Sequence, residues 1–290
     1  MDTHFLECFV AVVEQGSVAA AARQLNVAPS TLALRVRALE KELGFVLMTR
    51  SGRIARPTPA GAAVASRAAT ILNDLRSLTT LADDAEPRGQ LRLGVAQTAI
   101  TTVLCDVLPV IAEKYPNLEI IVQKGSSSQI FKMINDAVVD GAFLFHPPWP
   151  LPKGFVWYPL RQERYVVIAP SAETETNPLA LLRERPFVRY DRSLWSGQIA
   201  ENFLRAMRIR PTERVELDAL DAIAVLVDRG IGVSLVPERA IPLPAGLDLM
   251  KLPLGDLAPV RELGLLWPLG SAHARVMNVV RDETLKVGSA

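Results

Sequence analysis

The 290 residues are enough for two or three compact units, and a hydrophobic fraction of 49% supports real cores. No apolar run is long enough to span a bilayer, which excludes a chain of membrane-spanning helices and a membrane partner. The N-terminus lacks a basic start, an apolar signal core and a cleavage site, so we expect a cytoplasmic protein. The net charge of +1 conceals a local basic excess near the N-terminus.

The first sixty residues predict short helices followed by a basic hairpin. An amphipathic helix is followed by Ser17, whose hydroxyl suits an N-cap, and by an alanine run that favours a second helix. Asn26 can adopt the left-handed conformation that ends this helix, and the next helix starts near Pro29. Its buried stripe consists of Leu32, Val36, Leu39 and Leu43. Two helices joined by a tight turn form a helix-turn-helix, which places its second helix in the DNA major groove.

Six basic residues between positions 28 and 60 face two acidic ones. They are Arg35, Arg37, Lys41, Arg50, Arg53 and Arg56, against Glu40 and Glu42. Taken singly, an apolar stripe indicates core packing and a basic run indicates a solvated face. Here the stripe, the turn and the basic hairpin occur in the order of a winged helix, and the positive excess suits phosphate contacts.

On these residues the chain resembles the LysR-type transcriptional regulators. The matching residues are Phe9, Val12, Glu14, Gly16, Ser17, Ala21, Ala22, Leu25, Leu39, Glu40, Leu43, Gly44, Leu47, Arg50, Thr58, Pro59, Ala60 and Gly61. The chain departs from the family pattern at Ala33, where a serine is usual, and at Met48, where a phenylalanine is common. The resemblance implies an α/β protein with an N-terminal winged helix-turn-helix domain and a two-lobed effector domain like that of periplasmic binding proteins.

We expect six residues to contact DNA. Two hydroxyl side chains at the start of the recognition helix would touch phosphates or base edges, a leucine would pack on a thymine methyl group, and an arginine would read a guanine. Two further arginines in the wing would contact the backbone or the minor groove. In chain order they are Ser30, Thr31, Leu34, Arg35, Arg50 and Arg53.

A long helix is predicted to start at Thr58 and Pro59 and to end near Asp83. An isolated helix cannot bury its apolar stripe, so we expect a partner helix and hence a dimer; packing on the chain's own body is the alternative. The family resemblance implies an antiparallel dimer linker and a tetramer on DNA. The expected domains are therefore a winged helix over 1–57, a linker helix and hinge over 58–87, and an effector domain over 88–290.

From Gln90 onward, alternating strands and helices are typical of an α/β sheet. The expected strands are 91–96, 118–123, 142–145, 165–169, 187–190, 214–217, 233–236 and 263–267, and the expected helices are 101–115, 128–139, 178–183, 196–207, 219–228 and 272–286. The last strand and helix return to the first half. Lobe I then covers about 88–161 and 263–290, lobe II covers about 162–262, and two crossing strands and a cleft lie between them.

Ligands of such sheets bind beyond the carboxyl ends of the strands. The residues expected to bind an effector there are Thr98, Ser126, Ser127, Phe145, His146, Tyr190, Trp195 and Ser196. Hydroxyls and helix N-termini could hold an anion and aromatic rings could form apolar walls, so we hypothesise a small organic or aromatic acid. Aromatic rings are also typical of cores and serine clusters of solvated turns, and His146 is equally well interpreted as a loop histidine without a ligand.

The sequence gives little support for a metal site or a cofactor site. The three histidines are scattered, and the glycines of Gly230-Ile231-Gly232 precede a strand instead of following one. Cys8 and Cys105 fall on apolar faces of separate predicted helices, so we expect a reduced, buried pair, with a redox-sensing pair as the alternative. No cofactor and no metal is expected.

These patterns predict a sequence-specific regulator that binds promoter double-stranded DNA and itself and responds to a small-molecule effector. RNA polymerase is considered as a further partner. Two alternatives are kept: an α/β-class enzyme, for which no catalytic constellation is present, and a solute-binding protein with a fused DNA-binding head. The sequence specifies neither the effector, nor the operator, nor activation as opposed to repression.

Overall fold

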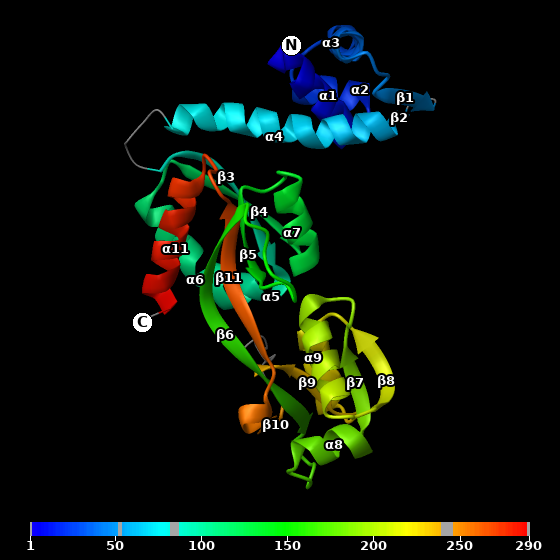
Figure 1. Cartoon of the computed structure of the whole chain (residues 1–290), viewed down its shortest axis with the longest axis vertical. Coiled ribbons are helices and arrows are strands. Elements are labelled where there is room, and N and C mark those ends of the chain that lie inside the picture. Colours follow the sequence, from blue (N-terminus) through cyan, green and yellow to red (C-terminus); the bar gives the residue numbers. More distant parts are fainter. Residues whose placement is uncertain (1, 52–53, 82–86, 239–245, 289–290) are drawn as a thin grey trace. The chain divides into compact units, whose positions relative to one another are not determined.

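The computed structural model describes residues 2–51, 54–81, 87–238 and 246–288 (Figure 1). The chain divides into two compact units, one of residues 1–86 with 135–139 and one of residues 87–134 with 140–290. Within the described residues, no helix combines the length and the apolarity needed to cross a membrane.

The N-terminal unit contains the predicted winged helix-turn-helix. Its elements are α1 (Thr3–Gln15), α2 (Val18–Gln24), α3 (Pro29–Leu43), β1 (Met48–Ser51), β2 (Ile54–Pro57) and α4 (Pro59–Leu81). The Ser17 hydroxyl accepts a hydrogen bond from the Ala20 N–H, and Asn26 adopts a φ of 53°, as predicted. Strands β1 and β2 pair antiparallel and form the wing. Phe9, Leu32 and Leu39 are fully buried and hold the three helices together.

Glu40 fixes the wing to the recognition helix α3. Its Oε1 accepts hydrogen bonds from the backbone N–H groups of Leu47, at 2.8 Å, and Met48, at 3.1 Å. These amides lie where the chain enters β1. One carboxylate oxygen on α3 therefore sets the position of the strand that follows it.

The start of α4 is attached to the same loop. Thr58 Oγ1 donates a hydrogen bond to the Val46 carbonyl oxygen at 2.9 Å and accepts one from the Gly61 N–H at 2.9 Å. A Cβ atom on Gly61 would lie 2.0 Å from the Leu47 carbonyl oxygen, so only glycine fits this approach. Thr58 thus caps α4, with Pro59 as its first helical residue, as predicted.

Helix α4 buries part of its apolar stripe within its own unit. Ala65, Ala68 and Leu72 are buried in the core that includes α1, whereas Leu75 is 40% exposed. The first half of the stripe is thus covered by the chain itself, which is the alternative considered for this helix, and the expected partner helix would cover only the second half. The side chains of residues 76–81 lie outside the described part of this helix.

The second unit is a pair of α/β lobes. Lobe I contains β3 (Gly89–Ala96), α5 (Gln97–Ala99), the π-helical turn η1 (Ile100–Leu104), α6 (Cys105–Lys114), β4 (Leu118–Gly125), α7 (Ser127–Asn135), β5 (Gly141–Phe145) and α11 (Ala274–Gly288). Lobe II contains α8 (Pro178–Glu184), β7 (Pro186–Tyr190), α9 (Trp195–Ala206), β8 (Thr212–Leu217), α10 (Leu220–Asp228), β9 (Ser234–Pro237), β10 (Leu249–Pro253) and the 3₁₀ turn η3 (Gly255–Leu257). Two long strands, β6 (Phe155–Pro170) and β11 (Val260–Pro268), belong to both lobes.

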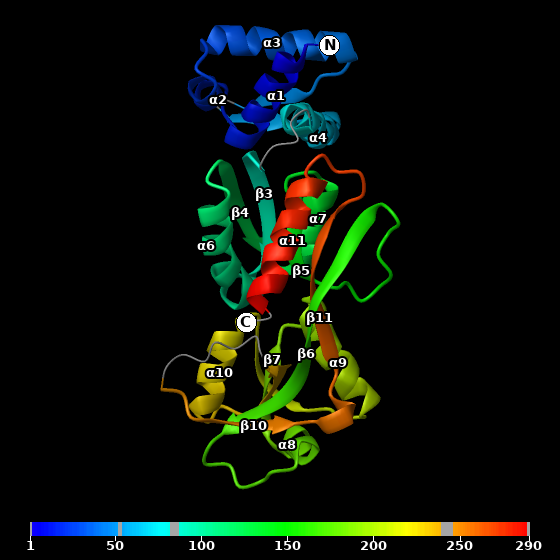
Figure 2. The same cartoon turned by 90° about the vertical axis from the view of Figure 1, so that its left-hand side faces the viewer.

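Strands β6 and β11 are the two crossing strands that the sequence predicted. They pair antiparallel and run side by side from one lobe into the other (Figure 2). The described sheet has the order β10-β6-β11-β5-β3-β4, and β9 also pairs with β6. Strands β3, β4 and β5 are parallel neighbours, so their carboxyl ends meet at one edge of lobe I.

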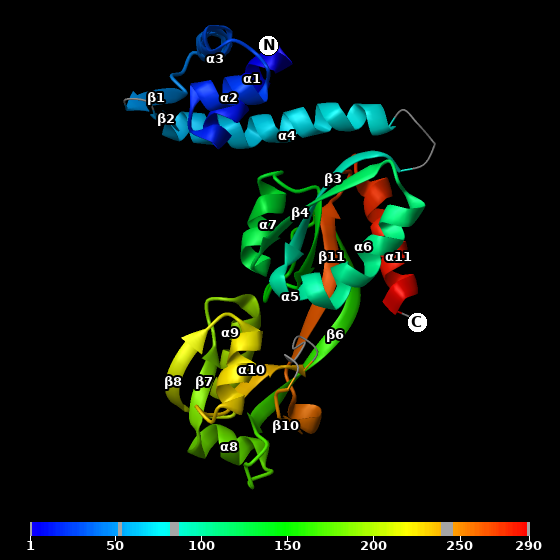
Figure 3. The same ribbon diagram turned by 180° about the vertical axis from the view of Figure 1, so that it is seen from behind.

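Alternate side chains of β6 point to opposite faces of the strand, so they belong to two separate parts of the lobe II core. Tyr165 and Val167 pack with side chains of α8 and α9, and Val166 and Ile168 pack with side chains of α10. Figure 3 shows these three helices in the lobe that holds the second half of β6. This arrangement fixes the starts of α9 and α10 close to the crossing strands.

Three sequence expectations need correction. Strand β6 begins at Phe155 instead of Tyr165, because Pro159 and the charged residues Arg161, Glu163 and Arg164 interrupt the strand pattern before Tyr165, and β10 was not predicted. Helix α7 ends at Asn135 instead of near residue 139, and Ala137 adopts a φ of 51°. Cys105 is exposed, whereas Cys8 is buried, and both are free thiols. The π-helical turn before Cys105 adds a residue to the helix and rotates the following residues away from the expected face.

We predict that Glu40→Ala destabilises the N-terminal unit by about 1–3 kcal/mol, because the amides at the start of β1 lose their acceptor. Thermal or urea unfolding followed by circular dichroism measures the loss. Glu40→Gln is the matched control, because both bonds go to one oxygen and an amide oxygen can accept them. Equal destabilisation by both variants would contradict this role.

Candidate functional site

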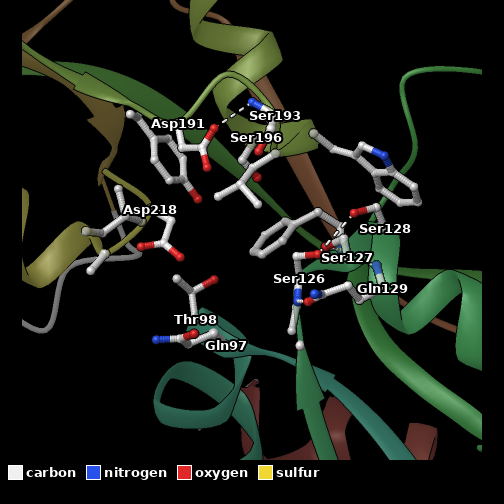
Figure 4. Close-up of a pocket in the computed structure, with 18 of the residues that line it drawn as sticks. Gln97, Thr98, Ser126, Ser127, Ser128, Gln129, Asp191, Ser193, Ser196 and Asp218 are labelled. Carbon is white, nitrogen blue, oxygen red and sulfur yellow. Dashed lines mark hydrogen bonds between the residues drawn. The ribbon is translucent and has the colours of Figure 1, made fainter. Parts of the chain in front are cut away.

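A cavity of about 700 Å³ lies between the two lobes of the second unit (Figure 4). Its volume is within the usual range for small-molecule sites. The lining residues are Ala96, Gln97, Thr98, Thr101, Lys124, Gly125, Ser126, Ser127, Ser128, Gln129, Phe145, Tyr190, Asp191, Ser193, Leu194, Trp195, Ser196, Asp218, Ala219, Leu220 and Asp221. Most of them follow the carboxyl ends of β3, β4, β5, β7 and β8.

The structure brings seven of the eight expected effector residues to this cavity. They are Thr98, Ser126, Ser127, Phe145, Tyr190, Trp195 and Ser196. His146 is not among the lining residues: its Nδ1 lies 2.7 Å from the Pro147 carbonyl oxygen, and its ring packs edge-on against Trp157 at 5.1 Å. Successive side chains of an extended chain point to opposite sides, so the position that brings Phe145 to the cavity turns the histidine away.

Trp149, an aromatic residue that follows β5, also lies outside the lining. Its ring packs edge-on against Trp195 at 5.0 Å, and the residue is 45% exposed. The tryptophan that does line the cavity, Trp195, also contacts Phe131 of α7 at 5.9 Å between ring centroids. Aromatic contacts therefore join the start of α9 in lobe II to α7 in lobe I.

Two buried hydroxyls line the cavity with their oxygens already occupied. Ser127 Oγ accepts a hydrogen bond from the Phe145 N–H, and Ser196 Oγ accepts one from Arg261 Nη1, both at 3.1 Å. Because each oxygen already accepts a protein hydrogen, the hydroxyl hydrogen can be donated elsewhere. The start of α9 adds backbone donors, since Leu194 makes no side-chain cap.

The sequence reasoning missed the acidic residues of this cavity. Asp191 follows β7, Asp218 follows β8, and Asp221 lies in the first turn of α10. The rule that selected Tyr190, proximity to a strand end, would also have selected the first two. Asp191 Oδ1 accepts a hydrogen bond from the Ser193 N–H at 2.7 Å, whereas no hydrogen bond or ion pair is found for Asp218 within the described residues.

Tyr190 lies between opposite charges. Burial raises the pKa of its hydroxyl, the nearby Arg261 guanidinium opposes that rise, and the Asp218 carboxylate adds to it. The tyrosine therefore stays protonated and offers a neutral hydroxyl to the cavity.

The candidate DNA surface is the outer side of α3. Leu34 is 64% exposed and Ser30 is exposed, whereas Thr31 is partly buried. Arg35 is also partly buried, and its Nη1 lies 3.7 Å from Cys8 Sγ of α1. Arg37, absent from the expected set, is exposed.

The two wing arginines can be placed only in part. Arg50 lies in β1, although its side chain is outside the described part of the residue, and Arg53 lies outside the described residues. The two positions that depart from the family pattern, Ala33 and Met48, both line a hollow of about 210 Å³ between α3 and the wing.

Two family models match the chain. One, described as the LysR substrate binding domain, matches residues 84–288, and the other, a bacterial regulatory helix-turn-helix protein of the lysR family, matches residues 3–62.

The chain belongs to the LysR family of transcriptional regulators. It is similar to the HTH-type transcriptional regulator CzcR of Bacillus anthracis, with 27% identity over 243 residues that cover 83% of this chain and 82% of the relative. It is also 23% identical to the hydrogen peroxide-inducible genes activator of Haemophilus influenzae over 299 residues, which cover 99% and 98% of the two chains.

Solved structures of LysR-family proteins share the fold. A full-length OxyR from Pseudomonas aeruginosa superposes with a TM-score of 0.77 at 20% identity and covers 98% of this chain and 94% of its own. Full-length CbnR in complex with its target DNA superposes with a TM-score of 0.67 at 21% identity and covers 98% and 100%.

In this LysR-family protein, a buried charge network lies beneath the cavity. Arg261 Nε donates to Glu163 Oε2 at 2.8 Å, and Arg161 donates from Nε and Nη2 to Glu163 Oε1 at 2.9 and 2.7 Å. Arg261 also lies over the Phe145 ring at 3.7 Å, and Arg161 donates to the Thr102 carbonyl oxygen of η1 at 2.9 Å. The network thus joins both crossing strands to the π-helical turn of lobe I.

Glu163 carries the only carboxylate of these three groups, so we predict that Glu163→Gln destabilises the second unit by about 3–5 kcal/mol. The variant leaves two arginines without their buried counter-charge. Chemical unfolding monitored by tryptophan fluorescence measures the change. Glu113→Gln, at an exposed position of α6, is the control and should have little effect. Similar stabilities of the two variants would contradict the role of the network.

Proposed function

We propose that this regulator binds a promoter site as a dimer, with α3 in the major groove and the β1–β2 wing beside it. Exposure of the outer side of α3 is the observation that carries the proposal: Leu34 and Ser30 face solvent, although apolar side chains of the same helix are buried. Leu34 is suited to a thymine methyl group, and Ser30 to a phosphate or base edge. CbnR, which shares this fold, is described in complex with its target DNA.

The two arginines of α3 are suited to different DNA contacts, because Arg35 is partly buried and Arg37 is exposed. The guanidinium of Arg35 approaches Cys8 of α1, so reading a guanine would require it to leave that contact. Arg37 is free to reach a phosphate, which positions the protein without selecting a base.

Dimerisation is proposed through the second half of α4. Leu75 remains 40% exposed where the contacts with α1 end, and an apolar helix side of this kind is stabilised by a second helix. A pair of dimers would form the tetramer that the sequence resemblance implies, and promoter binding would bring it close to RNA polymerase in the cytoplasm.

The cavity between the lobes is proposed to bind a small organic molecule with a carboxylate. Supporting this proposal, Ser127 and Ser196 present hydroxyl donors and α9 presents uncapped N–H groups. Binding would shift the protein between lobe arrangements only as far as the ligand prefers one of them. We favour regulation over catalysis because the same chain carries a helix-turn-helix unit of the lysR family.

We predict that Arg37→Ala weakens binding to every DNA sequence and lowers the slope of log affinity against log salt by about one. Fluorescence anisotropy over a salt series measures both quantities, with labelled DNA fragments from the region upstream of the gene that encodes this chain. Arg210→Ala, at an exposed position of lobe II, is the control and should leave the slope unchanged. An unchanged slope for Arg37→Ala would remove this residue from the DNA surface.

A further inference from the structure

The cavity has one end that attracts negative charge. Two arginines beneath it share a single carboxylate, so the group of Arg161, Glu163 and Arg261 carries an uncompensated positive charge. The Arg261 side chain is 1% exposed, and its Nη2 atom makes no hydrogen bond, although it lies 2.7 Å from Glu163 Oε2. A positive charge held this far from water acts strongly on any group bound next to it.

Two buried hydroxyls lie between this positive charge and the cavity surface or beside it. Ser196 is 5% exposed and accepts from Arg261, and Ser127 is 9% exposed and accepts from a backbone N–H. The Ser196 hydroxyl also lies within hydrogen-bonding reach of the Tyr190 hydroxyl, whereas no bond donated by the Ser127 hydroxyl is found within the described residues. A buried donor without an acceptor is unfavourable, so the Ser127 hydroxyl favours a ligand oxygen, which Ser196 and Tyr190 can also approach. Figure 4 shows Ser196 beside Ser193 at the start of α9, and Ser127 with Ser126 and Ser128 on the lobe I side of the cavity.

The opposite side of the cavity attracts positive charge. Figure 4 shows the carboxylates of Asp191 and Asp218 directed towards the open space, across from Ser126 and Ser127. Together with Asp221, three aspartates line the cavity, against one basic residue, Lys124.

Two of these aspartates have a local structural role, and one does not. Asp191 accepts from the Ser193 N–H, which shapes the turn before α9, and Asp221 lies in the first turn of α10, where a negative charge stabilises the helix. Asp218 has no such role: it follows the last residue of β8, and no partner is found for it within the described residues. Asp218 is exposed, so water solvates its carboxylate before a ligand binds, and the charge is available to that ligand.

We propose that the effector of this regulator is a zwitterion, a small molecule that carries a carboxylate and a protonated amine, as an α-amino acid does. The carboxylate binds Ser127, Ser196 and the first N–H groups of α9, and the ammonium group binds Asp218. Phe145 and Trp195 are the apolar surfaces for the remainder of the molecule. This inference rests on the proposed effector-binding role of the cavity, and it narrows the expected organic acid to one that also carries a positive charge.

A simple carboxylate satisfies only half of this site. It would pair with the Ser127 hydroxyl and the first N–H groups of α9 but would gain nothing from Asp218, whose exposed carboxylate repels a second negative charge. A simple amine fails in the opposite way, because it offers no acceptor to the Ser127 hydroxyl or to the first N–H groups of α9. Recognition therefore requires both groups on one molecule.

Isothermal titration calorimetry and thermal shift on the full-length protein test the proposal with the twenty L-amino acids. Each amino acid that binds is compared with its decarboxylated amine and its deaminated acid; for phenylalanine these are phenethylamine and 3-phenylpropanoate. We expect at least one amino acid to bind at least tenfold more tightly than either analogue. Asp218→Asn should lower the ratio of the affinity for the amino acid to that for the deaminated acid at least tenfold. Ser196→Ala should lower the ratio of the affinity for the amino acid to that for the amine.

Asp256→Asn, an exposed aspartate in η3, is the matched control and should change neither preference. A deaminated acid that binds as tightly as its amino acid, or a preference that survives Asp218→Asn, would overturn the zwitterion assignment while keeping the cavity as an effector site. Binding of none of the amino acids would overturn it as well. Promoter binding is measured separately in the anisotropy assay, so failure of the regulator function is distinguished from failure of this assignment.

Discussion

The buried ion pair between Arg261 of β11 and Glu163 of β6 is the interaction on which the second unit depends. It joins the only described strands that belong to both lobes, so it lies where any change in lobe arrangement must be accommodated. Through Ser196 it reaches the start of α9, and through Arg161 it reaches η1 in lobe I. The cavity surface, its charge and the hinge between the lobes are therefore determined by one connected set of side chains.

In the N-terminal unit, side-chain hydrogen bonds likewise connect elements that are separate in the sequence. Glu40 holds the first residues of the wing to the recognition helix, and Thr58 holds the start of α4 to the same loop. Neither residue needs to contact DNA to matter for DNA binding, because together they fix how the wing, α3 and α4 are arranged within the unit. This explains physically why a Leu-Glu pair and a Thr-Pro-Ala-Gly segment accompany the helix-turn-helix pattern in the sequence.

Much of this architecture could be predicted from the sequence because local rules govern it. Caps such as Ser17 and Thr58 and the alternation of strands and helices after Gln90 needed no tertiary information, and strand ends located most of the cavity. His146, which follows the same strand end as Phe145, lies outside the cavity lining because successive side chains of an extended chain alternate in direction, which proximity to a strand end does not take into account. Cys105 and the first half of β6 were misread because a π-helical turn and a run of charged side chains broke the expected periodicity. The network around Glu163 could not be predicted, since its partners are up to 98 residues apart.

The central claim is that a DNA-binding head and a ligand cavity act together in one regulator. DNase footprinting tests it most directly. The DNA is the region upstream of the gene that encodes this chain, and the purified full-length protein is used with each ligand that the calorimetry identifies. We expect a discrete protected site at moderate salt, in competition with bulk DNA, and a change in its extent or affinity when a bound ligand is added. Protection that is no stronger than on competitor DNA, or a footprint that stays the same when the cavity is saturated with ligand, would contradict the account.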